Sequence, residues 1–245
     1  GQDTGEGQDN RMNISDFVDV LDDGMPHFDF IMFDACFMMS VEVAYEVRNY
    51  TDYYIGSPTE NPGPGAPYDK VVPYMFKPGA AAQMAEAYFN HYKDNYKAGE
   101  GISNANWTGG TSICAVRTDA LDDLADVTGQ LLERADNESV PSFNTVFDYD
   151  KRDMEEGHVG YYDFSQMMEM RLDADAYVAW KNVFDASIVY WNTTDKNYSM
   201  FKRMFSMKGT NGITHYIPLS VDSKAAEAYR SMAWYKAAGL ENMGW

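Results

Sequence analysis

The sequence predicts an α/β fold in which helices cover a central sheet. Short apolar runs typical of buried strands occur at residues 28–33, 53–57, 113–116 and 213–219. Between these runs lie segments whose apolar residues recur at helical spacing. Alternating strands and helices indicate a layered sheet. With 245 residues, 45% of them hydrophobic, the chain can bury a substantial core.

The first half of the chain contains clear boundary signals. Ser15 is expected to cap a helix over residues 16–21, because serine accepts hydrogen bonds from a helix start. A helix over residues 38–48 is predicted directly after the first strand. Residues 58–67 hold four prolines and two glycines and are expected to form a loop.

The rest of the chain is mainly helical by its apolar spacing. Residues 99–110 are expected to form a loop, and residues 136–157 are charged and irregular. Predicted helices cover residues 80–96, 121–135, 163–170, 175–189 and 225–238. We divide the chain into a polar, flexible N-terminal segment (1–10), a first part of the core (11–135) and a C-terminal region that packs on the core and adds a late strand (136–245).

Composition excludes several classes of partner. Acidic residues number 38 against 19 basic ones, a formal charge of -19. That charge repels nucleic acid and anionic membranes and attracts basic partners. No apolar run approaches the ~20 residues that span a bilayer. Two cysteines, Cys36 and Cys114, are too few for a disulfide framework, and Cys114 in an apolar strand is interpreted as a core residue.

The beginning of the chain has no initiator methionine and no signal peptide. Residues 1–10 are polar, as expected for the new end of a cleaved surface loop. We therefore expect a processed product. The alternative is an arbitrary boundary with a cloning remnant at Gly1.

Cys36 is the candidate nucleophile. It lies between the strand at residues 28–33 and the helix predicted from Met38, where helix N–H groups favour a thiolate. Most single cysteines beside a buried strand are core residues, and spacing alone favours that interpretation.

Residues 30–48 with Asp34-Ala35-Cys36, residues 52–60 and the proline-glycine segment 62–69 together resemble the clostripain family of cysteine peptidases. The resemblance is strong over residues 11–76, and residues 209–219 are also similar to the family. It implies a caspase-like α/β/α sandwich with a mixed, mostly parallel sheet. It also implies that this chain is the heavy chain, completed by an N-terminal light chain that carries the catalytic histidine.

The four histidines of this chain agree with a missing partner. His27 precedes Cys36 by nine residues of extended chain, roughly 30 Å at ~3.3 Å per residue. His91 is expected to face solvent and His215 to be structural. His158, between glycines, is the internal candidate worth testing.

Further site residues follow from the resemblance. Asp34 lies two residues before Cys36 and would raise the pKa of a nearby thiol, so it needs another role. The family implies that it binds the basic side chain before the scissile bond. Ser57, Thr59, Glu60 and Asp69 are then expected to contact substrate, although Asp69 could instead cap the following turn.

Other chemistries lack their motifs. The sequence has no phosphate loop, no His-Glu-x-x-His zinc motif and no Cys-x-x-Cys pair. We expect no cofactor, although calcium is possible at an unknown site.

The sequence therefore predicts the heavy chain of a bacterial, secreted, periplasmic or cell-surface endopeptidase that is autoprocessed and cleaves after arginine or lysine. The alternatives are an inactive peptidase-like binding protein and a fragment that does not fold without its partner.

Overall fold

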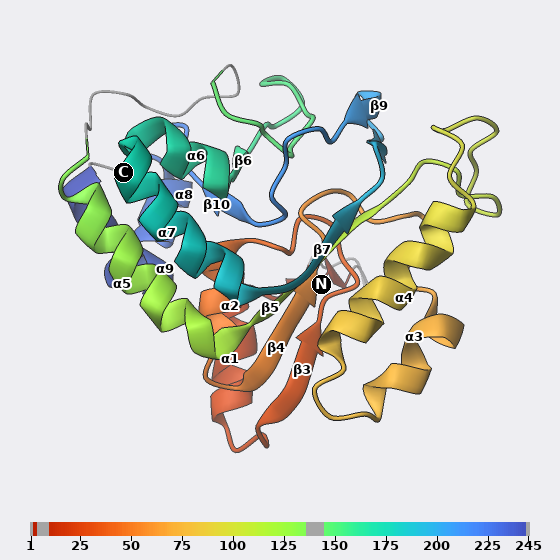
Figure 1. The fold of residues 1–245 in the computed structure, drawn as a ribbon, viewed down its shortest axis with the longest axis horizontal. Helices are drawn as coiled ribbons and strands as arrows, with labels where there is room; N and C mark the ends of the chain where they lie inside the picture. The colour runs from red at the N-terminus through yellow and green to blue at the C-terminus, as the bar shows by residue number, and fades with distance from the viewer. Residues whose placement is uncertain (1, 4–9, 136–144, 244–245) are drawn as a thin grey trace.

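The computed structural model describes residues 2–3, 10–135 and 145–243. Its centre is a mixed sheet in the order β3-β4-β5-β7, made of Phe28–Met32, Thr51–Gly56, Ser112–Arg117 and Ile188–Thr193. β3 and β4 are parallel, and β5 is antiparallel to both of its neighbours, β4 and β7. Three of these strands therefore run in one direction, which agrees with the predicted mixed, mostly parallel sheet (Figure 1).

Successive residues of the central strands point into two different cores, because side chains alternate along a strand. Tyr54 packs with Cys114 and Val116 on one face, while Ile55 packs with Ala115 on the other. The second face is covered by α3 (Tyr68–Met75) and α4 (Ala81–Asp94) (Figure 1). The first face is covered by helices at Ile14–Asp22 (α1), Val41–Val47 (α2), Leu121–Leu132 (α5) and Ala174–Ser187 (α7). The predicted α/β/α sandwich is confirmed.

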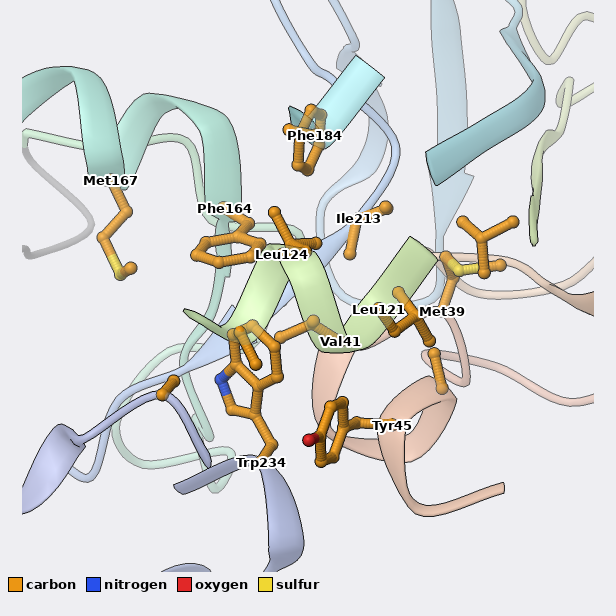
Figure 2. Packing of buried hydrophobic residues seen from close by; sticks show 14 of the residues in the cluster. Met39, Val41, Tyr45, Leu121, Leu124, Phe164, Met167, Phe184, Ile213 and Trp234 are labelled. Atoms are coloured by element: carbon orange, nitrogen blue, oxygen red, sulfur yellow. The ribbon is translucent and has the colours of Figure 1, made fainter. Parts of the chain in front are cut away.

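The larger core joins the two halves of the chain. Figure 2 shows Trp234 beside Tyr45, and their rings meet edge to face at 5.5 Å. Phe164 contacts Trp180 and Trp234 in the same manner, at 4.9 and 5.6 Å. Each of these aromatic residues is buried. Because apolar burial is the main stabilising contribution to folding, the C-terminal region and the first half of the chain are stabilised together.

The remaining elements form smaller units around this sheet. β6 (Tyr161–Asp163) pairs with β10 (Thr214–Tyr216), and β8 (Lys196–Ser199) pairs with β9 (Arg203–Ser206). β1 (Gln2–Asp3) pairs with β2 (Asn10–Arg11). Helices α6 (Phe164–Arg171), α8 (Lys224–Ser231) and α9 (Ala233–Ala237) and the short helices Thr118–Ala120 and Leu240–Met243 complete the described chain.

Several predicted boundaries were wrong. The helix after Cys36 begins only at Val41, because Ser40 caps it by accepting a hydrogen bond from Val43 N. Asn13, not Ser15, is the N-cap of α1. The helix predicted over residues 175–189 ends at Ser187, and the β-branched and aromatic residues that follow form β7.

Three further elements differ from the sequence prediction. The helix predicted over residues 225–238 is broken at Met232, whose backbone is extended. The late strand β10 pairs with β6, and β7 is the C-terminal strand that joins the central sheet. β1 and β2 include residues 2, 3 and 10 of the segment 1–10, which was expected to be flexible, while residues 1 and 4–9 lie outside the described residues. The proposed division into segments stays a prediction.

Candidate active site

Cys36 lies beyond the carboxyl end of β3, in a segment that runs alongside the continuation of β4. Three backbone hydrogen bonds join the two segments: Phe33 N to Ile55 O, Phe37 N to Thr59 O and Met39 N to Ser57 O, each 3.0 Å. The side chain of Cys36 is therefore presented at the edge of the sheet by a backbone that is fixed on both sides of it.

The thiol of Cys36 is exposed to solvent and sits against the loop that follows β4. Its Sγ accepts a hydrogen bond from the backbone N–H of Asn61 at 3.2 Å. Partial burial raises the pKa of Cys36, the Asn61 N–H lowers it, and the carboxylates of Glu60 and Asp34 raise it again. The net pKa lies above the ordinary 9.0. The expected activation by a helix start was wrong, because α2 begins five residues after Cys36 at Val41.

The residue after the nucleophile adopts a conformation that is rare for a residue with a side chain. Phe37 has a φ of +59°, a region that costs roughly 1–3 kcal/mol for such residues. Its ring stacks on Tyr161 at 5.3 Å with planes 12° apart, and its N–H is bonded to Thr59 O. These contacts hold the strained turn that presents Cys36.

Asp34 is an exposed carboxylate held by three donors. Its Oδ1 accepts from Asn61 Nδ2 at 3.1 Å. Its Oδ2 accepts from the backbone N–H of Ala66 at 2.9 Å and from the hydroxyl of Tyr68 at 3.2 Å. All three donors are neutral and come from the proline-glycine loop and the start of α3. The negative charge of Asp34 is therefore oriented by hydrogen bonds, and no cation among the described residues forms an ion pair with it.

Gly65 lets that loop approach Asp34. A Cβ at this position would lie 3.0 Å from Asp34 Oδ2, and the backbone φ is +78°, so glycine fits where other residues are strained. The Gly65 carbonyl accepts a hydrogen bond from the Tyr92 hydroxyl on α4. Helix α4 thus fixes the loop that orients Asp34.

Ser57 and Thr59 are fully buried. Their hydroxyls contact each other and Ser112, with a Thr59–Ser112 distance of 2.7 Å. Their carbonyls accept the Phe37 and Met39 N–H groups described above. Their side chains are enclosed, and the expected contact of Ser57 and Thr59 with substrate backbone stays a prediction. Through these two backbone hydrogen bonds, Ser57 and Thr59 fix the backbone of the segment that contains Cys36.

Glu60 binds the turn between β8 and β9. Its Oε1 accepts from Ser199 Oγ at 2.7 Å, and its Oε2 accepts from Met200 N at 3.0 Å. Arg152 binds Asp150 through two 2.9 Å hydrogen bonds. The charge of Glu60 contributes to raising the pKa of Arg152. Glu60 lies close enough to Cys36 to raise the pKa of the thiol, but both of its oxygens already have donors.

Asp69 is not joined to this group by any contact in the described structure. It lies in the first turn of α3, is exposed, and pairs with Lys70 at 2.9 Å. This arrangement fits the alternative in which Asp69 supports the helix start. A contact between Asp69 and substrate stays a prediction.

None of the four histidines is hydrogen-bonded to Cys36 among the described residues. His27 bonds Asp52 at 2.8 Å beside the start of β3, and His91 is exposed on α4. His215 is buried, accepts from Trp234 Nε1 at 3.1 Å, and has a pKa lowered to about 3 by burial. The prediction that His215 is structural is confirmed. His158, the internal candidate, is buried with its Nε2 3.0 Å from Asp148.

No group of three or more histidine, cysteine, aspartate or glutamate side chains in the described residues is arranged to hold a metal ion. No helix in the described parts of the chain is long and apolar enough to cross a membrane.

Sequence reasoning missed the residues that connect Cys36 to Asp34. Asn61 contacts both of them, through its backbone and its side chain, and Tyr68 contacts Asp34. The proline-glycine loop was the available signal, because such loops carry functional groups, but only the folded chain shows which of its donors face Asp34.

Comparison with known proteins agrees with this site. A protein-family scan matches the clostripain family over residues 1–242. The chain belongs to the clostripain family of cysteine peptidases. A search of curated proteins gives no match.

Solved structures of cysteine proteases share the fold. A cysteine protease of B. fragilis is 38% identical, with a TM-score of 0.88 over 100% of this chain and 98% of that chain. A secreted C11 cysteine protease from Bacteroides thetaiotaomicron, in complex with an irreversible peptide inhibitor, is 41% identical with a TM-score of 0.88, over 98% of this chain and 66% of that chain. An inactive zymogen C11 protease from Parabacteroides distasonis is 27% identical with a TM-score of 0.78, over 93% of this chain and 62% of that chain.

Proposed function

We propose that this clostripain-family chain is the nucleophile-bearing part of an endopeptidase that cleaves after arginine or lysine. The observation that carries the proposal is the pairing of an exposed thiol with an exposed carboxylate that has no cationic partner among the described residues. Cys36 and Asp34 are two residues apart and are linked through Asn61. A carboxylate oriented by neutral donors keeps its full charge for a cationic side chain.

In the proposed reaction, a histidine takes the proton of the Cys36 thiol, and the resulting thiolate attacks the carbonyl carbon after the basic residue and forms a tetrahedral intermediate. The C–N bond then breaks, the leaving amine takes a proton from a histidine, and a thioester remains on Cys36. Water attacks the thioester, releases the carboxylic acid and restores the thiol. Backbone N–H groups, that of Cys36 among them, would stabilise the developing oxyanion.

The histidine is proposed to come from a separate light chain. Two observations support this. The pKa of the Cys36 thiol is raised in the chain alone, so a neighbouring cation is needed to favour the thiolate at neutral pH. Among the described strands, β3 pairs with β4 on one side and with no strand on its other side. Such an edge can pair with a strand of another chain.

The protein substrate, the autoprocessing step and export from a bacterial cell are further parts of this proposal. The similarity to a secreted bacterial protease and the net charge of -19 favour a secreted enzyme with basic substrates. The alternative of an inactive binding protein is less favoured, because a binding scaffold does not require an exposed thiol next to an oriented carboxylate.

The test is hydrolysis of matched arginyl, lysyl and glutaminyl peptides by the full precursor after processing. We expect cleavage of the arginyl and lysyl peptides and not of the glutaminyl peptide. Comparable cleavage of all three would contradict the assigned specificity. Processed protein that binds a basic peptide without cleaving it would favour the binding protein.

A further inference from the structure

Glu60 and its neighbour Asn61 connect the Cys36 thiol to two different parts of the molecule. The backbone N–H of Asn61 donates to Cys36 Sγ at 3.2 Å, and its side chain donates to Asp34. Glu60 instead accepts from Met200 N at 3.0 Å, in the turn between β8 and β9. This turn is therefore bonded to the residue that directly precedes the one in contact with the thiol.

The β8–β9 turn presents apolar side chains to solvent. It consists of Met200, Phe201 and Lys202, because Ser199 and Arg203 are paired in the register of the two strands. The side chain of Met200 is 77% exposed and that of Phe201 is 43% exposed. Single apolar residues scattered on a surface are normal. Here two adjacent ones share a turn that hydrogen bonds hold beside the candidate nucleophile.

The backbone of this turn is fixed by several contacts. Ser199 Oγ donates to Glu60 at 2.7 Å and accepts from Phe201 N at 3.2 Å. The Cζ atom of Arg152 lies 6.0 Å from the centre of the Phe201 ring. Arg203, where β9 begins, has a φ of +59°, a conformation uncommon for residues with a side chain. A ligand that binds a turn held in this way loses little affinity in ordering it.

The turn lies within reach of a peptide bound at Cys36. The path from Cys36 Sγ to Met200 N crosses two hydrogen bonds of ~3 Å and one glutamate side chain, a separation on the order of 10 Å. Three residues of an extended peptide span about the same length, at ~3.3 Å each. A substrate residue close to the scissile bond can therefore contact the turn.

The proposed reaction gives the direction of the substrate. In that reaction, a histidine of the light chain, paired at the open edge of β3, protonates the leaving amine. The leaving half of the substrate then lies toward that edge, and the half bonded to Cys36 extends over β4. Glu60 is on the continuation of β4 (Thr51–Gly56), so the β8–β9 turn is on the side of the residues that precede the scissile bond.

We propose that Met200 and Phe201 form an apolar subsite for a substrate side chain that precedes the basic residue. This inference rests on the proposed function and adds a second point of recognition to Asp34. Leucine gains affinity by covering the exposed apolar surface of the turn, whereas serine does not. Figure 1 shows β9 far from α3, the helix that supplies Tyr68 to Asp34. A basic and an apolar side chain can therefore bind at the same time.

The experiment measures kcat/KM of the processed two-chain enzyme on three pairs of arginyl peptides. In each pair, leucine replaces serine at the second, third or fourth residue before the scissile bond. The wild type is expected to prefer leucine by roughly 5- to 20-fold at one of these positions, because a leucine on an exposed turn gains only part of the full burial contribution. The double variant Met200→Ser/Phe201→Ser is expected to lose that preference.

Val178→Ser is the matched control. Val178 is 59% exposed on α7, which packs on α5 and α6, so this variant should keep both the rate and the leucine preference. Met200→Lys is a second variant, expected to replace the leucine preference with a preference for glutamate at the same position. Such a gain cannot come from loss of folding, and substitutions at exposed positions rarely disturb the core.

The possible outcomes separate this inference from the proposed function. The absence of a leucine preference, or one that the double variant retains, would overturn the inference. Equal losses on the leucine and serine peptides would also overturn it, because they would show a structural role. Failure of the double variant to co-purify with the light chain would assign the turn to that contact instead. Wild-type enzyme that cleaves neither arginyl nor lysyl peptides would overturn the proposed function, and the inference with it.

Discussion

Two regions of the molecule bring an acidic side chain next to a potentially reactive group, and they differ in how completely those groups are enclosed. Glu42 Oε1 lies 3.7 Å from His215 Nδ1, and both residues are buried. Asp34 lies beside Cys36, and both are exposed. An acid and a histidine in contact resemble a catalytic pair, yet the pair in this chain that a substrate can reach is the other one.

The hydrogen bonds explain the difference. Glu42 accepts from Tyr216 N at 2.7 Å, and His215 accepts from Trp234 at 3.1 Å, so these groups join α2, β10 and α9 within the core. At the other region, the donors come from a loop and leave the Cys36 thiol and one site on Asp34 open to solvent. Proximity alone therefore does not identify a catalytic group; accessibility and unfilled hydrogen-bond sites do.

Replacing the nucleophile gives the largest expected effect. Cys36→Ala should lower peptide hydrolysis by the processed enzyme by more than ~1,000-fold, because no other group forms the thioester. Cys114→Ala is the matched control, since Cys114 is buried in β5 and burial raises its pKa. It should retain activity with a small loss of stability. Activity that survives Cys36→Ala would contradict the assignment of Cys36 as the nucleophile.

Neutralising Asp34 gives the next largest expected effect. Asp34→Asn should reduce kcat/KM for arginyl peptides by roughly 100-fold or more, because it removes the charge that is proposed to bind the cationic side chain. Asp69→Asn should change this value by less than about threefold, since Asp69 is exposed and paired with Lys70. A large loss with Asp69→Asn would support the prediction that Asp69 binds substrate.

The buried Glu42–His215 pair should affect the free energy of unfolding and not the rate of catalysis. Burial raises the pKa of Glu42 from 4.5 to about 7. A carboxyl whose pKa is raised on folding stabilises the fold fully below pH 4.5, and this contribution is lost as the pH rises through 7. Denaturant unfolding of the wild type should therefore lose about 3 kcal/mol from this group between pH 4.5 and 8. Glu42→Gln should flatten that pH dependence, and an unchanged slope would contradict it.

The smallest expected effect is a shift in the pKa of the Cys36 thiol. Glu60 and Asp34 both raise the pKa of Cys36. Glu60→Gln should therefore lower the pH midpoint of Cys36 alkylation in the chain alone, by less than about one unit. Titration of the iodoacetamide rate with pH measures this shift. A midpoint that rises in Glu60→Gln would show that the variant disturbs the loop more than the charge.

The sequence predicted the architecture better than the site. Strands such as Thr51–Gly56 and Ser112–Arg117 were found because their apolar residues form distinct runs. The strand Ile188–Thr193 was missed because it follows helix α7 without a turn residue. The delayed start of α2 at Val41 was missed because apolar spacing continues through residues that are not helical.

At the site, the resemblance to the clostripain family selected Cys36 and Asp34, because spacing alone favoured a core role for Cys36. Their partners could not be predicted, because Asn61, Ala66 and Tyr68 meet Asp34 only through the path of an irregular loop. Burial of Ser57 and Thr59 was also hidden, since hydroxyls of this type occur equally in substrate grooves and in closed networks such as the one with Ser112.

The most direct test of the central claim is peptide mapping of the processed enzyme after reaction with an arginyl chloromethyl ketone. A single covalent adduct on Cys36 is expected, strongly reduced in Asp34→Asn and absent in Cys36→Ala. This result would place nucleophile and basic-residue recognition at the same end of the sheet. An adduct on Cys114, or equal labelling of Asp34→Asn and the wild type, would contradict the account.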